Sequence, residues 1–476
     1  MTIYNKQVDV VLISVECGFL PSLAALSLES YLNKAGIKAE ILYPKISRDS
    51  LQTLIKKILE FKPSVVGLGG LFNDRFIIKK IIEALGPYRK NFKIVIGGNL
   101  VTPIPEYMVD KLSADIGVIG EGEIIFTKLV EKILEDKDFS GIGGLAFKED
   151  DKVIFTGQGE YIKDLNELPS LNYEKIPMEY FVSVYKFYKN ITRNNIFTPS
   201  SRLGAVFTGR GCLYECNFCY HFNTLRLLKI PAIILQMKEL KERFSINMVR
   251  FLDDLTLVNK KRTLEFCQAL LKEKLNLKYI VSAHFNCLDK EMVIALKESG
   301  CVQIALGLES GSQEVLNRIN KGVKVEQIRQ GLELLRKYRI NWNGGIQVGQ
   351  LGETKNDVKK TKNLFYPYIS ELATVSAAIT TPYPGSPLYN YGLKSGLIKD
   401  NEDFFNKFRN LQGLTVNFSK MSNLRVNYLR LKLAFDFDFK KQKILRGILG
   451  VYLFLLRMLI MKIVVRIKGR RNRRVI

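Results

Sequence analysis

The chain has 476 residues, of which 47% are hydrophobic and 25% are charged. This composition excludes a disordered or fibrous chain, and the length predicts two or three domains. The formal net charge is +25, but about half of the excess lies in residues 440–476, which contain twelve Lys or Arg and no Asp or Glu. Because the rest of the chain is only mildly basic, the net charge is weak evidence for nucleic-acid binding.

The cysteines argue against a disulfide framework. There are seven of them; three lie within eight residues and the other four are isolated. An odd, partly clustered set is typical of a reducing compartment. The N-terminal residues also lack a signal-peptide pattern. We therefore expect a cytoplasmic protein.

Residues 8–138 alternate short apolar runs with segments of helical periodicity. Five such units predict an α/β fold with a doubly wound parallel sheet. Ligands of these sheets bind past the carboxyl ends of the strands. The sequence places glycines there, although they could serve only as tight turns. The expected strands cover residues 8–14, 39–43, 64–69, 93–96 and 115–119, and the turns to examine contain Gly97, Gly98, Gly120 and Gly122.

The alternation of strand and helix patterns stops after about residue 138 and resumes from about residue 204. Residues 144–157 predict a hairpin, and Pro169 and Pro177 mark a linker. Six further strands are expected, and polar residues at their carboxyl ends are the candidates for chemistry. These strands cover residues 204–208, 248–252, 279–283, 302–308, 344–348 and 374–380.

Cys212, Cys216 and Cys219 form a C-x3-C-x2-C loop after the first of these strands. Three thiolates can hold an iron-sulfur cluster and leave one iron open to a small chelating molecule. A structural zinc site would need a fourth ligand, for which His221 is available, and usually uses paired C-x2-C spacings. The spacing therefore favours a cluster over zinc.

With the apolar run before it and Tyr220 after it, this loop resembles that of the radical S-adenosylmethionine (radical SAM) enzymes. The resemblance implies that Cys212, Cys216 and Cys219 bind a 4Fe-4S cluster whose open iron chelates S-adenosylmethionine. One electron, from a donor such as flavodoxin or ferredoxin, then yields a 5'-deoxyadenosyl radical. The resemblance also implies a partial (β/α)6 barrel. In such enzymes the protein supplies position and exclusion of water.

The N-terminal segment resembles the cobalamin-binding domain of cobalamin-dependent radical SAM enzymes. The residues that carry this resemblance are Gly97-Gly98-Asn99 and Gly120-Glu121-Gly122-Glu123. One departure is Leu100, where many relatives carry histidine. The chain has only His221 and His284, so nothing before residue 221 can offer imidazole to cobalt.

Several polar residues follow barrel strands. Asp253 and Asp254 could contact S-adenosylmethionine or a substrate, or could cap a helix before Thr256. Glu309 and Ser310 look like the family's E-S-G element, which implies contact with the ribose or methionine portion. Further candidates in the cofactor site are Gly345 and Gln347 on the fifth strand, where glycine lets adenine approach the backbone.

His284 ends the third strand, where relatives often carry Arg. We consider two roles for it, a catalytic acid or base and a hydrogen-bonded core residue; a lone His in an apolar strand more often has the second.

These observations predict four segments. They are a Rossmann-like cobalamin-binding domain in residues 1–140, a hairpin and linker in 141–198, a radical SAM barrel in 199–400 and a C-terminal extension in 401–476. The function that the resemblance implies is C-methylation of an unactivated carbon. Radical oxidation, rearrangement or ring closure without methyl transfer is the alternative reaction, and a non-catalytic cobalamin- or cluster-binding regulator is the alternative class.

The C-terminal tail is a candidate membrane-contact segment. Residues 444–465 are mostly apolar, but their longest uncharged run is ten residues, short of the roughly 20 that a spanning helix needs. With the basic residues up to 476, they suit the inner face of an anionic membrane and would make a lipid a candidate substrate. A helix packed on the barrel is the alternative. No nucleic acid is expected, because the basic run lacks interleaved aromatic residues.

Overall fold

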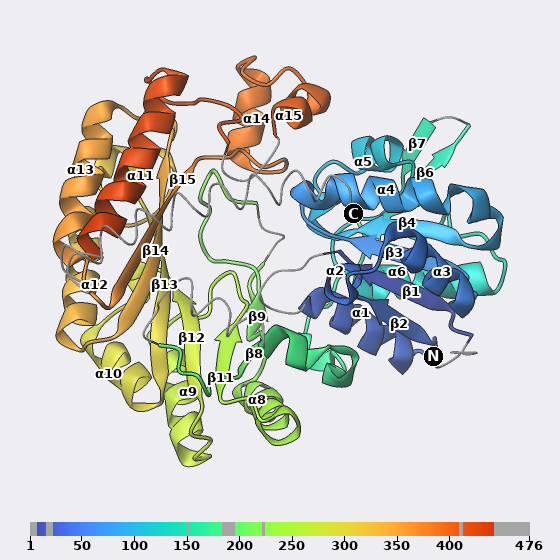
Figure 1. The fold of residues 1–476 in the computed structure, drawn as a ribbon, viewed down its shortest axis with the longest axis horizontal. Coiled ribbons are helices and arrows are strands. Elements are labelled where there is room, and N and C mark those ends of the chain that lie inside the picture. Colours follow the sequence, from blue (N-terminus) through green and yellow to red (C-terminus); the bar gives the residue numbers. More distant parts are fainter. Residues whose placement is uncertain are drawn as a thin grey trace. The chain divides into compact units, whose positions relative to one another are not determined.

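The computed structural model describes residues 7–15, 22–150, 152–182, 196–220, 224–408 and 413–441. They belong to two compact units, which meet in sequence between Tyr185 and Lys186 (Figure 1). His221 and the apolar basic tail, residues 444–476, lie outside the described residues. No helix in the described ranges is long and apolar enough to cross a membrane.

The first unit is built on a seven-stranded sheet. Five strands are parallel, in the order β2-β1-β3-β4-β5, and an antiparallel hairpin, β6-β7, extends the sheet beyond β5. The five predicted strands are therefore confirmed, whereas the hairpin joins the same sheet. The bounds are β1 Val10–Ser14, β2 Ala39–Leu42, β3 Val65–Gly69, β4 Lys93–Gly97, β5 Ile116–Val118, β6 Leu145–Glu149 and β7 Lys152–Phe155.

Helices cover this sheet in two groups. α1 packs against α6, whereas α3 packs against α4 and α4 against α5. Because every residue of β1 is buried, this strand lies in the centre of the core, as expected for a near-continuous apolar run in a parallel sheet. The helices are α1 Leu23–Lys34, α2 Pro44–Ser47, α3 Leu51–Phe61, α4 Arg75–Leu85, α5 Pro105–Leu112 and α6 Gly122–Leu134.

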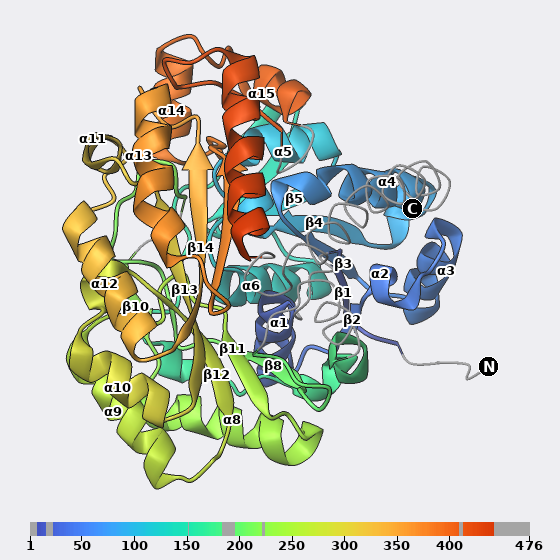
Figure 2. The same cartoon turned by 60° about the vertical axis from the view of Figure 1, so that its left-hand side comes forward.

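The second unit contains a six-stranded sheet in the order β8-β11-β12-β13-β14-β15, with every pairing parallel. This confirms the six predicted strands and the partial barrel. Figure 2 shows β8, β11, β12, β13 and β14 of this sheet side by side, with helices along their outer face. The bounds of the strands are β8 Leu203–Val206, β11 Met248–Phe251, β12 Lys278–Ala283, β13 Cys301–Glu309, β14 Asn341–Val348 and β15 Ala373–Ile379.

The helices of this unit follow the strands in turn. They are α8 Ile230–Phe244, α9 Lys260–Lys272, α10 Lys290–Glu298, α11 Gln313–Arg318, α12 Val325–Lys337, α13 Lys355–Phe365, α14 Pro387–Lys394 and α15 Asn401–Lys407. A further helix covers residues 423–441. It packs through Val426, Leu429, Leu433 and Phe437, which are buried and recur every three or four residues.

Candidate active site

The cysteine loop leaves the sheet directly after β8. A short ladder between β9 (Gly209–Arg210) and β10 (Arg226–Leu227) holds its two ends together. Gly211 has a φ of +86°, a conformation that glycine adopts without steric cost. The chain turns back on itself between two cysteines, because the backbone N–H of Cys219 donates to the carbonyl of Cys216 at 3.0 Å.

The turn after α11 clamps this loop from the side. The N–H of Asn217 donates to the carbonyl of Ile319 at 3.0 Å, and the Asn217 side chain donates to the carbonyl of Arg318 at 2.9 Å. The Asn320 amide donates to the carbonyl of Glu215 at 2.9 Å. Three hydrogen bonds therefore fix the loop to the segment that follows β13 and α11.

The three thiols lie close enough to influence one another. Burial raises the pKa of Cys216, and the charges of Glu309 and Cys212 raise it further, whereas Lys321 lowers it. Desolvation, with the charges of Cys216, Asp254 and Cys212, raises the pKa of Cys219 to about 12, and Lys321 again opposes the shift. Lys321 therefore opposes the effect of desolvation at both Cys216 and Cys219.

Within the described ranges, no three His, Cys, Asp or Glu side chains are grouped so that they could hold one metal ion. In a cluster each thiolate binds a different iron, so its ligands need not converge on one point. Three thiols on one loop could each bind a different iron of such a cluster.

Glu309 is the buried acid beside the loop. It ends β13, its exposed fraction is 7% and its φ is +53°, a strained value for a residue other than glycine. Its Oε1 accepts a hydrogen bond from Lys321 Nζ at 3.1 Å, and its Oε2 accepts one from Gln347 Nε2 at 2.7 Å. Both carboxylate oxygens are thus held from two different elements.

The remaining barrel residues divide into packed and open positions. Ser310 is fully buried, and its hydroxyl lies 3.1 Å from that of Thr361 on α13, so it fixes the backbone of the E-S-G element. Gly345 on β14 is open, because a Cβ built there would meet nothing within 4 Å. Of these two predicted cofactor contacts, only Gly345 leaves space for a ligand.

The two aspartates have different surroundings. Asp253 accepts hydrogen bonds from the Thr208 N–H and hydroxyl, both at 2.6 Å, and from the Gly209 N–H at 3.2 Å. Asp254 is exposed, and its charge raises the pKa of Cys219. The predicted helix cap before Thr256 is wrong, because α9 begins at Lys260 with Asn259 as its cap.

His284 is a packed residue with both ring nitrogens in use. Its Nε2 lies 3.0 Å from the Lys321 carbonyl, and its Nδ1 accepts from the Asn286 N–H at 3.3 Å. The ring stacks on Tyr214 of the cysteine loop, with centroids 3.8 Å apart. Burial, with the charge of Lys321, lowers the pKa of His284 to about 4. A neutral ring that positions the loop fits this geometry better than an acid.

The predicted glycines of the first unit lie at the carboxyl edge of its sheet. Gly97 ends β4, and Gly98 and Gly120 have φ values of +75° and +85°. Thr102 links the two turns, because its hydroxyl donates to the Gly98 carbonyl and accepts from the Gly120 N–H, both at 3.0 Å. A Cβ at Gly98 would meet nothing within 4 Å, whereas one at Gly122 would lie 2.9 Å from Leu28. Gly122 therefore serves the packing of α6 on α1.

A second feature of that edge suits a polar ligand. Ser14 ends β1 beside Gly69 of β3. Its hydroxyl is buried and has no hydrogen-bond partner among the described residues, which is rare unless a ligand or water satisfies the group. The orphan hydroxyl and the open glycine turns together fit a large polar cofactor such as cobalamin.

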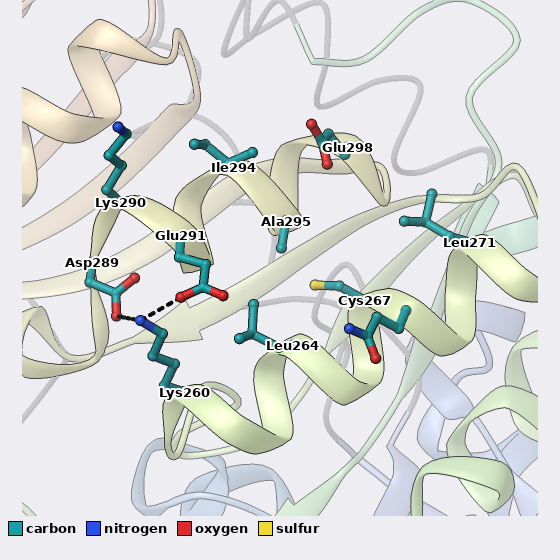
Figure 3. Close-up of a pocket in the computed structure, with 11 residues that line it drawn as sticks. Lys260, Leu264, Cys267, Leu271, Asp289, Lys290, Glu291, Ile294, Ala295 and Glu298 are labelled. Carbon is teal, nitrogen blue, oxygen red and sulfur yellow. Dashed lines mark ion pairs between the residues drawn. The ribbon is translucent and has the colours of Figure 1, made fainter.

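A groove elsewhere on the barrel lies away from this chemistry. It runs between α9 and α10 and is lined by residues of these helices and Asp289. Figure 3 shows Lys260 at one end, paired with Asp289 at 3.1 Å and Glu291 at 2.6 Å. The lining contains no residue of the cysteine loop, so the groove is not part of the candidate site.

Comparison with known proteins agrees with this geometry. Residues 206–365 match the radical SAM superfamily, and residues 8–130 match the B12 binding domain. The fold resembles that of the radical S-adenosylmethionine methyltransferase TsrM from Kitasatospora setae, solved with cobalamin and a 4Fe-4S cluster. The TM-score is 0.67 at 16% identity, covering 82% of this chain and 75% of that one.

Two sequence relatives have names that describe different reactions. An uncharacterized methyltransferase of Pyrococcus horikoshii is 27% identical and covers 72% of each chain. The anaerobic magnesium-protoporphyrin IX monomethyl ester cyclase of Cereibacter sphaeroides is 24% identical over 71% of this chain, which spans 55% of that relative. The chain therefore belongs to the radical SAM superfamily, in the cobalamin-dependent group that carries a B12 binding domain.

Sequence reasoning missed Lys321 and Gly307. A Cβ at Gly307 would lie 2.4 Å from Lys321 Nζ and 2.6 Å from Glu309 Oε1, so this glycine makes room for the buried pair. A glycine two residues before an acid that ends a strand was the available signal, but it is weak without the structure.

Proposed function

We propose that the chain is a cobalamin-dependent radical SAM methyltransferase that methylates an unactivated carbon. One observation carries this proposal: the same chain contains a B12 binding domain and a three-cysteine loop. The buried Glu309–Lys321 ion pair lies close enough to this loop for both charges to influence Cys216. The relative and the solved neighbour that are named methyltransferases support methyl transfer in particular.

Each group has a defined place in this proposal. Cys212, Cys216 and Cys219 would hold a 4Fe-4S cluster, and Glu309 and Gln347 would bind S-adenosylmethionine beside it. Gly345 leaves open space on β14, which would admit the flat face of an adenine. With these cofactors and cobalamin bound, the chain would have a source of a carbon-centred radical and a source of a methyl group.

The chain's own residues hold the Glu309 carboxylate and the cysteine loop in position. Gln347 and Lys321 each donate a hydrogen bond to a different Glu309 oxygen, so the carboxylate cannot rotate freely before a ligand arrives. His284 stacks on Tyr214 of the loop and helps to keep the loop in place. A preorganised polar site of this kind needs little rearrangement when it binds its cofactor.

The deciding experiment follows the methyl group. The reconstituted chain is incubated anaerobically with cobalamin, methyl-labelled S-adenosylmethionine, a flavodoxin or ferredoxin as electron donor, and a cell extract. A labelled product that is absent with Cys212→Ala supports methyl transfer. Production of 5'-deoxyadenosine without any labelled product would instead favour the second candidate, a radical oxidation, rearrangement or ring closure, which the cyclase relative supports.

The cobalamin part has a test of its own. Because the first unit contains no histidine, we propose that bound cob(II)alamin has no imidazole ligand from the protein. Electron paramagnetic resonance of the full chain, grown with 14N- or 15N-histidine, should give identical spectra. A nitrogen splitting that changes with the label would contradict the proposed binding mode.

We also propose that the protein is cytoplasmic and docks on an anionic membrane. Helix 423–441 exposes four apolar side chains spaced by four, three and four residues, which places them on one face. The chain continues from it into the apolar and purely basic residues 444–476. Cations of this kind are attracted to anionic headgroups. The exposed fractions are 84% for Leu424, 53% for Tyr428, 56% for Leu431 and 43% for Phe435.

Sedimentation with vesicles tests this contact. The full chain should pellet with anionic vesicles and not with neutral ones, and a chain ending at Lys443 should pellet less. Leu424→Glu with Leu431→Glu should weaken binding, whereas Leu235→Glu on α8, which is 60% exposed, should not. Equal binding by all forms, or self-association in place of vesicle binding, would refute membrane docking and with it the case for a lipid substrate.

A further inference from the structure

Lys321 is a charged residue in a buried position. Its exposed fraction is 7%, and an ammonium group that is removed from water is costly unless a negative charge compensates it. Among the described residues, its hydrogen-bond acceptor is Glu309 Oε1, at 3.1 Å. An ammonium has three donors, so one carboxylate oxygen leaves part of its capacity unused.

The surroundings are shaped to keep this lysine in place. Gly307 lacks the Cβ that would otherwise collide with both members of the pair. The Lys321 carbonyl faces His284 Nε2 at 3.0 Å, and the preceding residue, Asn320, is hydrogen-bonded to the cysteine loop. The backbone around Lys321 is therefore held by His284 on one side and by the cysteine loop on the other, and its side chain has little freedom to leave.

Lys321 is buried beside the cysteine loop. The residues just before it are bonded to that loop, because the Ile319 carbonyl accepts from the Asn217 N–H at 3.0 Å and the Asn320 amide donates to the Glu215 carbonyl at 2.9 Å. With a cluster bound, three thiolates and Glu309 would place four negative charges in this region, beside the buried ammonium of Lys321. An iron-sulfur cluster becomes more negative when it accepts an electron, and net charge near a cluster is one of the factors that set its reduction potential.

We propose that Lys321 is a positioning residue that fixes Glu309 and raises the reduction potential of the cluster held by Cys212, Cys216 and Cys219. Its positive charge stabilises the state that has gained one electron from the external reductant. Glu309 acts with the opposite sign, so the pair sets a potential that neither residue would set alone. This inference rests on the proposed function, because it requires the cluster.

The test is a redox titration of the reconstituted full chain, with dithionite as reductant and the cluster signal followed by electron paramagnetic resonance without S-adenosylmethionine. Lys321→Met should shift the midpoint potential to a more negative value, and Glu309→Gln to a less negative one. The double variant should return toward the wild-type value, because its net charge is restored. Lys321→Arg should stay near wild type.

Lys324→Met is the matched control. Lys324 lies three residues away and is exposed, so water screens its charge and the potential should not move. If Lys321→Met takes up no cluster, Glu309→Gln and the double variant decide the point. Equal potentials in all forms with normal iron content, or shifts of the same sign in both single variants, would overturn the inference. A wild-type chain that binds no cluster would instead refute the proposed function.

Discussion

At the scale of single residues, Asp253 shows how an acid at a barrel mouth can be structural. It ties the end of β8 to β11 through three hydrogen bonds to Thr208 and Gly209. Burial raises its pKa, and these hydrogen bonds oppose the shift. A carboxylate that satisfies three donors has little capacity left for a ligand.

Replacement of Asp253 should therefore affect stability. Asp253→Ala leaves partly buried donors without an acceptor and should lower the free energy of unfolding by about 1–3 kcal/mol. Asp254→Ala removes an exposed side chain and should change it by less than about 0.5 kcal/mol. Urea unfolding of the cluster-free chains, followed by circular dichroism, compares them. Equal stability of both variants would contradict the structural role of Asp253.

Glu353 should make the stability of the fold depend on pH. It is buried, and its carboxylate accepts from the Gly349 N–H at 2.7 Å. Burial raises its pKa from 4.5 to about 8, so the folded chain holds this proton more tightly than the unfolded chain does. Its contribution to stability is present below pH 4.5 and is lost as the pH rises to about 8.

Glu353→Gln removes this proton equilibrium. The melting temperature of the wild type should therefore fall more steeply than that of Glu353→Gln between pH 5 and pH 8. Differential scanning calorimetry at a series of pH values measures this. Parallel curves for the two proteins would show that the carboxyl group titrates normally in the fold.

At the scale of elements, two glycines on neighbouring strands have different surroundings. Gly307 on β13 gives space to a side-chain pair, whereas Gly345 on β14 faces space that no described residue fills within 4 Å of a Cβ. The first therefore serves the fold and the second is free to serve a ligand.

Alanine at the two positions should separate these roles. Gly307→Ala forces the buried Lys321–Glu309 pair to move and should destabilise the chain by about 1–3 kcal/mol. Gly345→Ala should leave the unfolding free energy within about 0.5 kcal/mol and weaken S-adenosylmethionine binding. Calorimetric titration of the reconstituted protein measures the binding. Unchanged affinity with Gly345→Ala would remove β14 from the proposed cofactor site.

Element prediction succeeded where the signal is local. Strand and helix periodicity gave all five parallel strands of the first sheet and all six of the second. The attachment of the hairpin to β5 could not be predicted, because that pairing depends on contacts between segments about 30 residues apart, such as Ile116 with Phe147. The start of α9 was misplaced because Leu257 first forms a bridge to Ala283, and this delays the helix to Lys260.

At the scale of the whole molecule, sequence motifs identified the family and the three cysteines. They could not reveal Lys321, because its burial and its pairing with Glu309 arise only when the turn after α11 folds back on the cysteine loop. They also could not separate Asp253 from Asp254, since the donors that occupy Asp253 lie 45 and 44 residues away in sequence. Long-range contacts therefore decide which residues of a motif are available for chemistry.

We infer that the cysteine loop makes this chain a radical SAM enzyme. The most direct measurement is the formation of 5'-deoxyadenosine from S-adenosylmethionine by the anaerobically reconstituted protein with dithionite. We predict formation by the wild type and none by the Cys212→Ala, Cys216→Ala, Cys219→Ala triple variant, which should also lose the cluster spectrum. A triple variant that keeps a normal cluster and still forms 5'-deoxyadenosine would contradict the account.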